Sequence, residues 1–422
     1  MAIEMNEFSE NRKLLLNVAL KHAAEMLHEP EGFLSCPYID PGGPYSRTLW
    51  DWDSFWASCA LLGIAEKIEN TAQAEEFKLQ TLHYAKGALK NFFLLQGVDG
   101  SLPILISDKN PDWFNSLTVA ENNMAKPVQG QFCLMLDKYG VWDDDEKAFC
   151  LNALIRALEC RKRRYLNQAT GLYVWANDVA IGVDDDPAAW GRPPFSSANI
   201  FLNSLMYQDL SAAAVFAGNC GAGGGKSMFE DEAVRLREAV NCFCWDRRDG
   251  IYYSADVQCR QNLSPHPAFG TLNINLEPFW RCLPVKVMSW VSFLPLWCKI
   301  AGSEQASSMI EKHLLNPSRF WTPYGIRSLS ADERMYSPDV SRGNPSNWLG
   351  PVWIITCYMV WQGLKNYGYG EKASELAVNV TKMLADDYRR NGLLHEYYHP
   401  ETGNGISGPG FLNWNLLACI ME

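Results

Sequence analysis

Hydrophobic residues recur along most of the chain at the three- and four-residue spacing of an amphipathic α-helix. Leu16, Leu20, Ala23 and Leu27 are separated by 4, 3 and 4 residues, which places them on one helical face. Similar stripes predict twelve helices, near residues 10–28, 51–66, 72–93, 126–140, 144–164, 198–217, 226–244, 285–300, 303–315, 348–366, 371–390 and 411–420. The chain is therefore expected to be all-α.

The connections between these helices alternate between long and short. Long segments rich in glycine, proline, asparagine and aromatic residues cover 29–50, 94–125, 165–197, 245–284, 316–347 and 391–410. Short joins lie near 67–71, 141–143, 218–225, 301–302 and 367–370. The alternation predicts six helical hairpins with the long loops on one face, where function usually concentrates. No low-complexity linker or charge run divides the sequence, so we expect residues 1–422 to form a single domain.

Composition and charge narrow the function classes. A formal net charge of -11 disfavours nucleic acid, whose phosphates are bound by Lys and Arg, and also disfavours an anionic membrane surface. No stretch approaches the roughly 18 apolar residues of a transmembrane helix. The 13 cysteines are scattered without a disulfide framework, and the first residues carry no signal-peptide pattern. We therefore expect a cytoplasmic protein. Its oligomeric state stays open.

Two motifs that could bind phosphate or metal have simpler explanations. Residues 221–227, GAGGGKS, lack the spacing of a phosphate-binding loop and follow a predicted helix instead of a strand. A flexible turn between helices is expected there. His395 and His399 lie in a loop without a third ligand nearby, so neither a metal nor another cofactor is expected.

Tryptophan and acidic residues give a stronger chemical signal. Many of the 16 tryptophans stand in loops beside Asp, Asn or Gly, namely Trp50, Trp52, Trp175, Trp190, Trp348 and Trp353. Core packing explains any single large aromatic residue, but repeated pairing with short polar residues also suits a sugar. Segments 180–190, AIGVDDDPAAW, and 394–405, LHEYYHPETGNG, set acids among apolar residues, which raises a carboxyl pKa. Taken alone, each segment is more simply explained as a turn with surface acids.

Five segments share the order and spacing of motifs in a known group of enzymes. They are 40–55, DPGGPYSRTLWDWDSF; 288–297, MSWVSFLPLW; 320–336, FWTPYGIRSLSADERMY; 344–353, NPSNWLGPVW; and 396–405, EYYHPETGNG. Together they resemble the clan of the trehalases and family 63 glycoside hydrolases, especially the mannosylglycerate and glucosylglycerate hydrolases. The resemblance implies an (α/α) toroid of six helical hairpins whose long loops form the active site, which agrees with the helix pattern.

Residue by residue, the resemblance assigns roles in an inverting α-glycoside hydrolase. Asp184 matches the general acid and Glu396 the general base. Asp185 and Asp186 stay open as alternatives, because Asp186 stands where the family usually has Ser. Candidate substrate-binding residues are Tyr45, Arg47, Trp52, Asp53, Gln129, Trp190, Arg342, Asn347, Trp348, Tyr397 and Trp414. Pro44 replaces the Arg of the trehalase motif, which counts against trehalose as the substrate.

The substrate implied by this resemblance is a small α-linked carbohydrate, mannosylglycerate or glucosylglycerate. A glycerate leaving group would need a cation, for which Arg47 and Arg342 are the first candidates and Lys126 and Arg192 weaker ones. An α-glucosidase acting on gluco-oligosaccharides is one alternative. A catalytically silent sugar-binding protein on the same fold is another.

Overall fold

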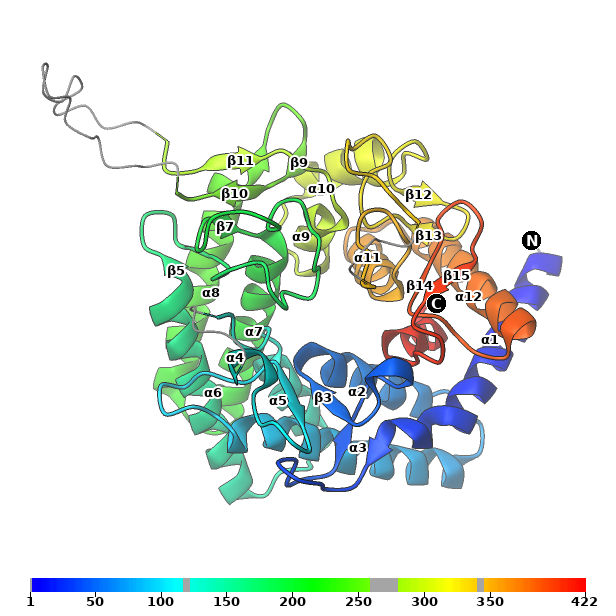
Figure 1. Cartoon of the computed structure of the whole chain (residues 1–422), viewed down its shortest axis with the longest axis horizontal. Helices are drawn as coiled ribbons and strands as arrows, with labels where there is room; N and C mark the ends of the chain where they lie inside the picture. The colour runs from blue at the N-terminus through cyan, green and yellow to red at the C-terminus, as the bar shows by residue number, and fades with distance from the viewer. Residues whose placement is uncertain (1, 117–121, 259–279, 340–344) are drawn as a thin grey trace, which may run out of the picture.

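The helices of the protein form a closed ring around a central axis (Figure 1). The computed structural model describes residues 2–116, 122–258, 280–339 and 345–422. Six helical segments line the inside of the ring and six cover its outside, so the predicted all-α toroid of six hairpins is confirmed.

The inner segments are α2 (Asp51–Ala65), α5 (Gln129–Lys138), α7 (Ile200–Asn219), η3 (Trp290–Phe293) continued by α9 (Leu294–Trp297), α11 (Ile354–Asn366) and η5 (Asn413–Ile420). The outer segments are α3 (Thr71–Leu94), α6 (Asp144–Tyr165), α8 (Gly223–Phe243), α10 (Ser303–Met309) continued by η4 (Ile310–Leu314), α12 (Gly370–Asn391) and α1 (Ala2–His22). Burial separates the two layers, since inner α2 buries 13 of its 15 residues and outer α12 only 9 of 22. None of the described helices is long and apolar enough to span a membrane.

The two ends of the chain close the ring together. The sixth pair combines η5 from the C-terminal end with α1 from the N-terminal end, beside α12 (Figure 1). Arg12 Nε donates to the carbonyl oxygen of Cys419 at 3.2 Å, and Arg389 Nη2 donates to Asn11 Oδ1 at 2.6 Å. These contacts join segments more than 370 residues apart in sequence.

Local sequence explains where several helices begin. Asp143 and Glu146 form a capping box at the start of α6, which satisfies free backbone N–H groups there. At α8 the expected turn over 218–225 is too long, because the helix already begins at Gly223. Gly221, with φ 74°, completes the turn, and the N–H of Lys226 bonds to the carbonyl of Ala222. The glycines therefore form the first turn of α8.

The helix expected over 285–300 is wrong in most of its length. Residues Leu283–Val285 form strand β11, and only η3 and the single turn α9 follow. Pro295 lies in that turn and lacks the N–H that would continue a regular α-helical ladder.

The long loops are braced by short antiparallel strands that the sequence did not predict. The pairs are β1 (Leu27–His28) with β2 (Tyr38–Ile39), β3 (Thr48–Trp50) with β4 (Leu105–Ser107), β5 (Leu166–Asn167) with β6 (Leu172–Tyr173), β8 (Trp245–Asp246) with β9 (Ile251–Tyr252), β12 (Trp321–Thr322) with β13 (Gly325–Ile326), and β14 (Tyr397–Tyr398) with β15 (Gly405–Ser407). Strand β10 (Ser254–Asp256) pairs with both β7 (Ser197–Ala198) and β11. The remaining short helices are η1 (Ala23–Met26), η2 (Gly43–Tyr45) and α4 (Trp113–Ser116).

Candidate active site

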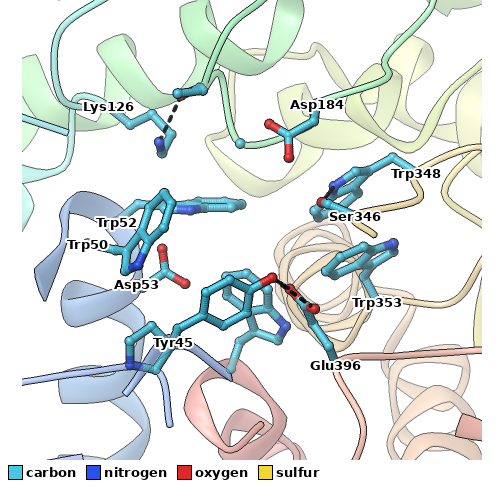
Figure 2. A pocket seen from close by; sticks show the side chains of 14 residues that line it. Tyr45, Trp50, Trp52, Asp53, Lys126, Asp184, Ser346, Trp348, Trp353 and Glu396 are labelled. Atoms are coloured by element: carbon cyan, nitrogen blue, oxygen red, sulfur yellow. Dashed lines mark hydrogen bonds between the residues drawn. The ribbon is translucent and has the colours of Figure 1, made fainter. Parts of the chain in front are cut away.

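The long loops meet around a cavity at the end of the ring where the inner segments α2, α11 and η5 begin. Figure 2 shows this cavity from close by. The cavity encloses about 490 Å³, counting the part open to solvent. Its lining residues are Pro41, Tyr45, Trp50, Trp52, Asp53, Lys126, Ala180, Gly182, Asp184, Ser346, Trp348, Trp353, Glu396 and Trp414. They come from four of the six predicted long connections, from Lys126, Trp348 and Trp353 just beyond such connections, and from the first residues of α2 and η5. The expectation that these loops gather on one face therefore holds for those four.

Asp184 faces the cavity from the loop between β6 and β7, opposite Glu396 in Figure 2. Burial raises the pKa of Asp184, while a hydrogen bond with Ser346 and the charge of Lys126 act in the opposite direction. Gly182, with φ 91°, brings this loop close to the cavity. A Cβ there would lie 3.3 Å from Trp52 Cζ2 and 3.1 Å from Lys126 Cδ.

The other two aspartates of this loop bond to the surrounding protein. Asp185 accepts a hydrogen bond from the backbone N–H of Trp348 at 2.8 Å, and burial raises its pKa to about 7. Asp186 accepts from Asn199 Nδ2 at 2.8 Å, and thereby ties the loop to the start of α7. Of the three aspartates, only Asp184 lines the cavity.

Glu396 lies on the opposite wall, immediately before β14. Its backbone N–H bonds to the carbonyl of Ser407 at 2.8 Å, which fixes it within the β14–β15 hairpin. The side chain is buried, and desolvation raises its pKa to about 8, with a smaller contribution from Asp184. The Tyr45 hydroxyl donates to both carboxyl oxygens at 3.1 and 3.2 Å, which lowers the pKa of Glu396.

Gly408, with φ 62°, allows the end of the hairpin to pass over Glu396. A Cβ at this glycine would lie 2.5 Å from Glu396 Cβ and 2.7 Å from Oε2. Local backbone geometry therefore positions both carboxyl groups, with one left-handed glycine in each loop.

Aromatic rings form much of the cavity wall. Trp348 and Trp353 are stacked with ring centroids 3.9 Å apart and planes 3° apart. Trp414 packs against Trp353 and Trp52 at 5.9 and 5.4 Å. Within the described structure the buried indole N–H of Trp414 has no hydrogen-bond partner. Stacked aromatic surfaces beside unsatisfied polar groups suit a sugar ring and its hydroxyl groups.

A buried cation lies beside these rings. Lys126 is 2 % exposed, and its Nζ lies 2.9 Å from Asp51 Oδ1, 3.3 Å from the carbonyl of Ala180 and 5.8 Å above the Trp52 ring. Asp51 and Asp53 occupy the first turn of α2, where the helix dipole favours negative charge. Asp53 lines the cavity and accepts from Asn413 Nδ2 at 2.6 Å, and burial raises its pKa.

The structure places seven of the thirteen predicted site residues around the cavity: Tyr45, Trp52, Asp53, Asp184, Trp348, Glu396 and Trp414. Arg342 lies outside the described residues. The remaining five, Arg47, Gln129, Trp190, Asn347 and Tyr397, do not line it.

Arg47 and Trp190 point elsewhere. The guanidinium of Arg47 pairs with Glu31 at 2.9 Å, and its side chain is 70% exposed. Trp190 is 52% exposed and does not line the cavity. Arg192, a weaker candidate for a leaving-group cation, pairs with Asp256. Arg47 and Arg192 therefore each pair with a carboxylate of the protein itself, although the sequence suggested that they bind the carboxylate of the substrate.

Three predicted contacts instead lie behind the cavity wall. Gln129 bonds to the carbonyl of Lys126 and accepts from Arg161, both at 3.0 Å. The carbonyl of Asn347 accepts from Trp353 Nε1 at 2.8 Å. The Tyr397 ring stacks on Trp353 at 4.7 Å. Each holds a lining residue in place.

Besides Pro41, Ala180 and Gly182, four lining residues were not among the predicted substrate-binding residues, namely Trp50, Lys126, Ser346 and Trp353. The two tryptophans belong to the loop aromatics, and Lys126 was considered only as a leaving-group cation. Ser346 lies inside the 344–353 motif, and nothing in the sequence indicated a function for this residue by itself.

Among the described residues no group of three or more His, Cys, Asp or Glu is arranged to hold a metal. His395 Nδ1 lies 2.9 Å from Asp387.

Comparison with known proteins places this cavity in context. Residues 108–414 match the model of the mannosylglycerate hydrolase MGH1-like glycoside hydrolase domain. A probable mannosyl-oligosaccharide glucosidase of Schizosaccharomyces pombe is 26% identical over 363 residues, which cover 80% of this chain and 39% of that protein. Mannosylglycerate hydrolase MGH1 of Selaginella moellendorffii is 27% identical over 236 residues, which cover 56% of this chain and 41% of that protein. The chain thus aligns with about two fifths of each curated relative.

Among solved structures, the family 63 mannosylglycerate hydrolase of Thermus thermophilus in complex with glucose has the same fold. The TM-score is 0.66 at 18% identity, over 97% of this chain and 99% of that one. The family match covers well over half of the sequence, and the fold and the order of motifs agree with it. The chain therefore belongs to the MGH1-like family of glycoside hydrolases.

Proposed function

We propose that this glycoside hydrolase cleaves a small α-linked glycoside with inversion of configuration, and that mannosylglycerate or glucosylglycerate is its substrate. The observation that carries the proposal is the pair Asp184 and Glu396, which face one aromatic-walled cavity from opposite sides (Figure 2). We further propose that the whole chain acts as one catalytic domain.

In this mechanism Asp184 protonates the glycosidic oxygen as the bond to the anomeric carbon breaks. Glu396 takes a proton from the water that attacks the opposite face of that carbon. Burial raises the pKa of Asp184, which is the direction that a general acid requires. Because burial raises the pKa of Glu396 to about 8, the ionised form that a general base requires increases as the pH rises toward that value, and the Tyr45 hydroxyl favours that form. Attack of water from the second wall would invert the configuration at the anomeric carbon without a covalent intermediate.

Lys126 supports an anionic leaving group. Its ammonium group has three N–H donors, of which Asp51 and Ala180 account for two. Among the described lining residues it is the only Lys or Arg, and the net charge of -11 would otherwise repel an anion. A structure of the Thermus thermophilus mannosylglycerate hydrolase was solved with Tris and D-glycerate. This cation therefore replaces Arg47 as the first candidate for the glycerate carboxylate.

The substrate is tested by comparing kcat/KM on α-mannosyl or α-glucosyl glycerate with that on the matching glycerol glycoside. We expect the glycerate compound to be favoured by roughly 10–100-fold, since a charge-assisted bond contributes about 1.5–3 kcal/mol. Lys126→Gln should shrink this ratio while the rate on the glycerol glycoside changes less. A general loss of folding would lower both rates equally. Equal rates on both compounds in the wild-type enzyme would contradict the glycerate assignment.

The α-glucosidase alternative keeps one specific support, the alignment with the Schizosaccharomyces pombe protein over 80% of the chain. A gluco-oligosaccharide would have to extend beyond the cavity through the part that is open to solvent. Faster release of glucose from an α-linked oligosaccharide than from glucosylglycerate would establish this second function.

A further inference from the structure

A second hollow lies at the opposite end of the ring axis. It encloses about 1020 Å³, counting the part open to solvent, and is lined by Tyr207, Gln208, Ser211, Trp297, Cys298, Lys299, Trp361, Gln362, Lys365 and Asn366. Helix α11 connects the two sites, because Trp353 precedes its first turn and Asn366 is its last residue. At about 1.5 Å per residue, its 13 residues separate them by roughly 20 Å. We call this second site the distal hollow.

An aromatic layer separates the distal hollow from the active-site cavity. Trp56, one helical turn beyond Trp52 on α2, lies 6.1 Å from Trp297 and 6.0 Å from Tyr358 between ring centroids. These rings are buried. The distal hollow is therefore a separate site with its own lining, and a ligand there would not occupy the catalytic cavity.

Two exposed ammonium groups border the hollow. Lys299 and Lys365 have no carboxylate at ion-pair distance among the residues that the structure describes. Lys365 Nζ instead lies 4.4 Å from the Trp361 ring centroid. Most described lysines of this acidic protein do pair with carboxylates, so two unpaired lysines at one concave site indicate affinity for an anion.

Lys299 has an unfavourable backbone conformation. It follows the end of α9 with φ 58°, in the left-handed region where glycine is the usual residue. The turn is fixed by the N–H of Ile300, which bonds to the carbonyl of Pro295 at 3.0 Å. The dipole of α11 explains Lys365 in its last turn, but no such preference explains a lysine in the left-handed position. Backbone strain at a concave site points to a functional side chain.

The rings in the hollow leave little room for a stacked ligand. Trp361 is stacked on Tyr358 at 5.7 Å and approached by Lys365, and Trp297 packs on Trp56. Polar groups remain. The side chains of Tyr207 and Gln208 make no hydrogen bond within the described structure, and Asn366 uses only its Nδ2, on the carbonyls of Leu296 and Trp297. The lining therefore recognises hydroxyl groups and negative charge better than an aromatic base.

We propose that the distal hollow binds a small phosphorylated sugar. The ammonium groups of Lys299 and Lys365 bind the phosphate. The side chains of Tyr207 and Gln208 and the side-chain carbonyl oxygen of Asn366 form hydrogen bonds with the sugar hydroxyls. A hexose monophosphate fits within a hollow of this size, which is in the usual range for small-ligand sites. The proposal is independent of the substrate at the catalytic cavity.

The test is calorimetric titration of the full-length protein at low salt with glucose 6-phosphate, inorganic phosphate and glucose. We expect glucose 6-phosphate to bind at one site per chain and to bind more tightly than either of the other two probes. The Lys299→Gly/Lys365→Gln double variant should weaken this binding at least tenfold. Lys13→Gln, which removes an exposed charge on α1, is the matched control and should bind like wild type.

Two further variants keep the test decisive. Lys299→Gly relieves the left-handed strain, so it should melt no lower than wild type while it loses affinity, which separates ligand binding from folding. Asp53→Asn alters the catalytic cavity and should leave this binding unchanged. Unaltered affinity in the double variant, loss of binding in Asp53→Asn, or equal affinity for inorganic phosphate and glucose 6-phosphate would each overturn the proposal.

Discussion

The two ends of the ring axis carry opposite charges in different surroundings. At the catalytic end, Asp184 and Glu396 are withdrawn from solvent among aromatic rings, and burial raises both pKa values. At the distal end, Lys299 and Lys365 are exposed beside rings that are already covered. The inner helices begin at the first end and finish at the second, so their dipoles favour acids at one and cations at the other. The dipole alone does not make a catalytic site. In the proposed active site the long loops add what the helix dipoles lack, because they bury the two acids.

The largest difference between the two ends should appear when the buried carboxyls are neutralised. Asp184→Asn and Glu396→Gln each remove a proton transfer, so each should lower kcat by roughly 10²–10⁴-fold in a correctly folded protein. The pair can be told apart with an α-glycosyl fluoride, which needs no acid. Asp184→Asn should retain turnover of the fluoride, whereas Glu396→Gln should not.

Two outcomes would break this assignment. If Asp184→Asn stayed active on the glycoside while Asp185→Asn or Asp186→Asn lost activity, a neighbouring aspartate would be the acid. If Glu396→Gln, and not Asp184→Asn, turned over the fluoride, the two carboxyl groups would exchange roles.

The cost of burying Glu396 gives a second, smaller effect. Its pKa rises from 4.5 to about 8 on folding, so between these pH values the unfolded chain binds fewer protons than the folded protein. Stability from this group is full below about pH 4.5 and is lost as the pH rises toward 8. Glu396→Gln should therefore stabilise the protein by on the order of 2–4 kcal/mol at pH 8 and very little at pH 4.5.

Chemical denaturation at both pH values measures this difference. Glu238→Gln, on the exposed face of α8, is the matched control and should show no such dependence. A variant at Glu396 that is no more stable at pH 8 than at pH 4.5, relative to wild type, would show that this carboxyl is not strained by burial.

Tyr45 sharpens the comparison, because its hydroxyl is the hydrogen-bond donor on the buried Glu396. Removing it in Tyr45→Phe should raise the pKa of Glu396 further, and the ascending limb of kcat/KM against pH should move to higher pH. On that limb the rate should fall by roughly tenfold, in line with a charge-assisted hydrogen bond. An unchanged profile with a uniformly lower rate would show that Tyr45 only binds substrate.

The smallest effect is expected at the distal end. Lys299→Gly removes a left-handed lysine and should stabilise the protein by about 1 kcal/mol, with no change in glycosidase activity. Thermal unfolding and the rate on the glycerol glycoside measure the two quantities. A loss of activity in this variant would mean that the two ends of the ring are coupled.

Much of the fold was predictable because burial of one helical face leaves a periodic trace in the sequence. Eleven of the twelve expected helices lie near their expected positions, whereas most of the helix expected over 285–300 is replaced by strand β11, a loop and two short helical turns. The short strands were not predictable, since a pair such as Tyr397–Tyr398 is too short to show alternation. The composition of the loops that carry these strands could be read from the sequence, but the course of their backbone could not.

The site was harder to predict than the fold, because the direction in which a loop side chain points depends on the tertiary structure. Lys126 and Gln129 are three residues apart, yet one lines the cavity and the other bonds to Arg161 behind it. Asp184, Asp185 and Asp186 are consecutive, and the fold turns only the first toward the cavity. Arg47 pairs with Glu31, which lies 16 positions earlier in the sequence, and no motif identifies this partner.

In the proposed mechanism, water attacks under the control of Glu396 while Asp184 protonates the leaving group from the other wall. Proton magnetic resonance of the sugar released from an α-linked glycosylglycerate during the first turnovers tests this mechanism directly. We expect the β-anomer to appear first and then to mutarotate, with the two carboxyl groups roughly 6.5–9.5 Å apart to admit the water. First release of the α-anomer would mean a retaining mechanism and would rule out these roles for Asp184 and Glu396.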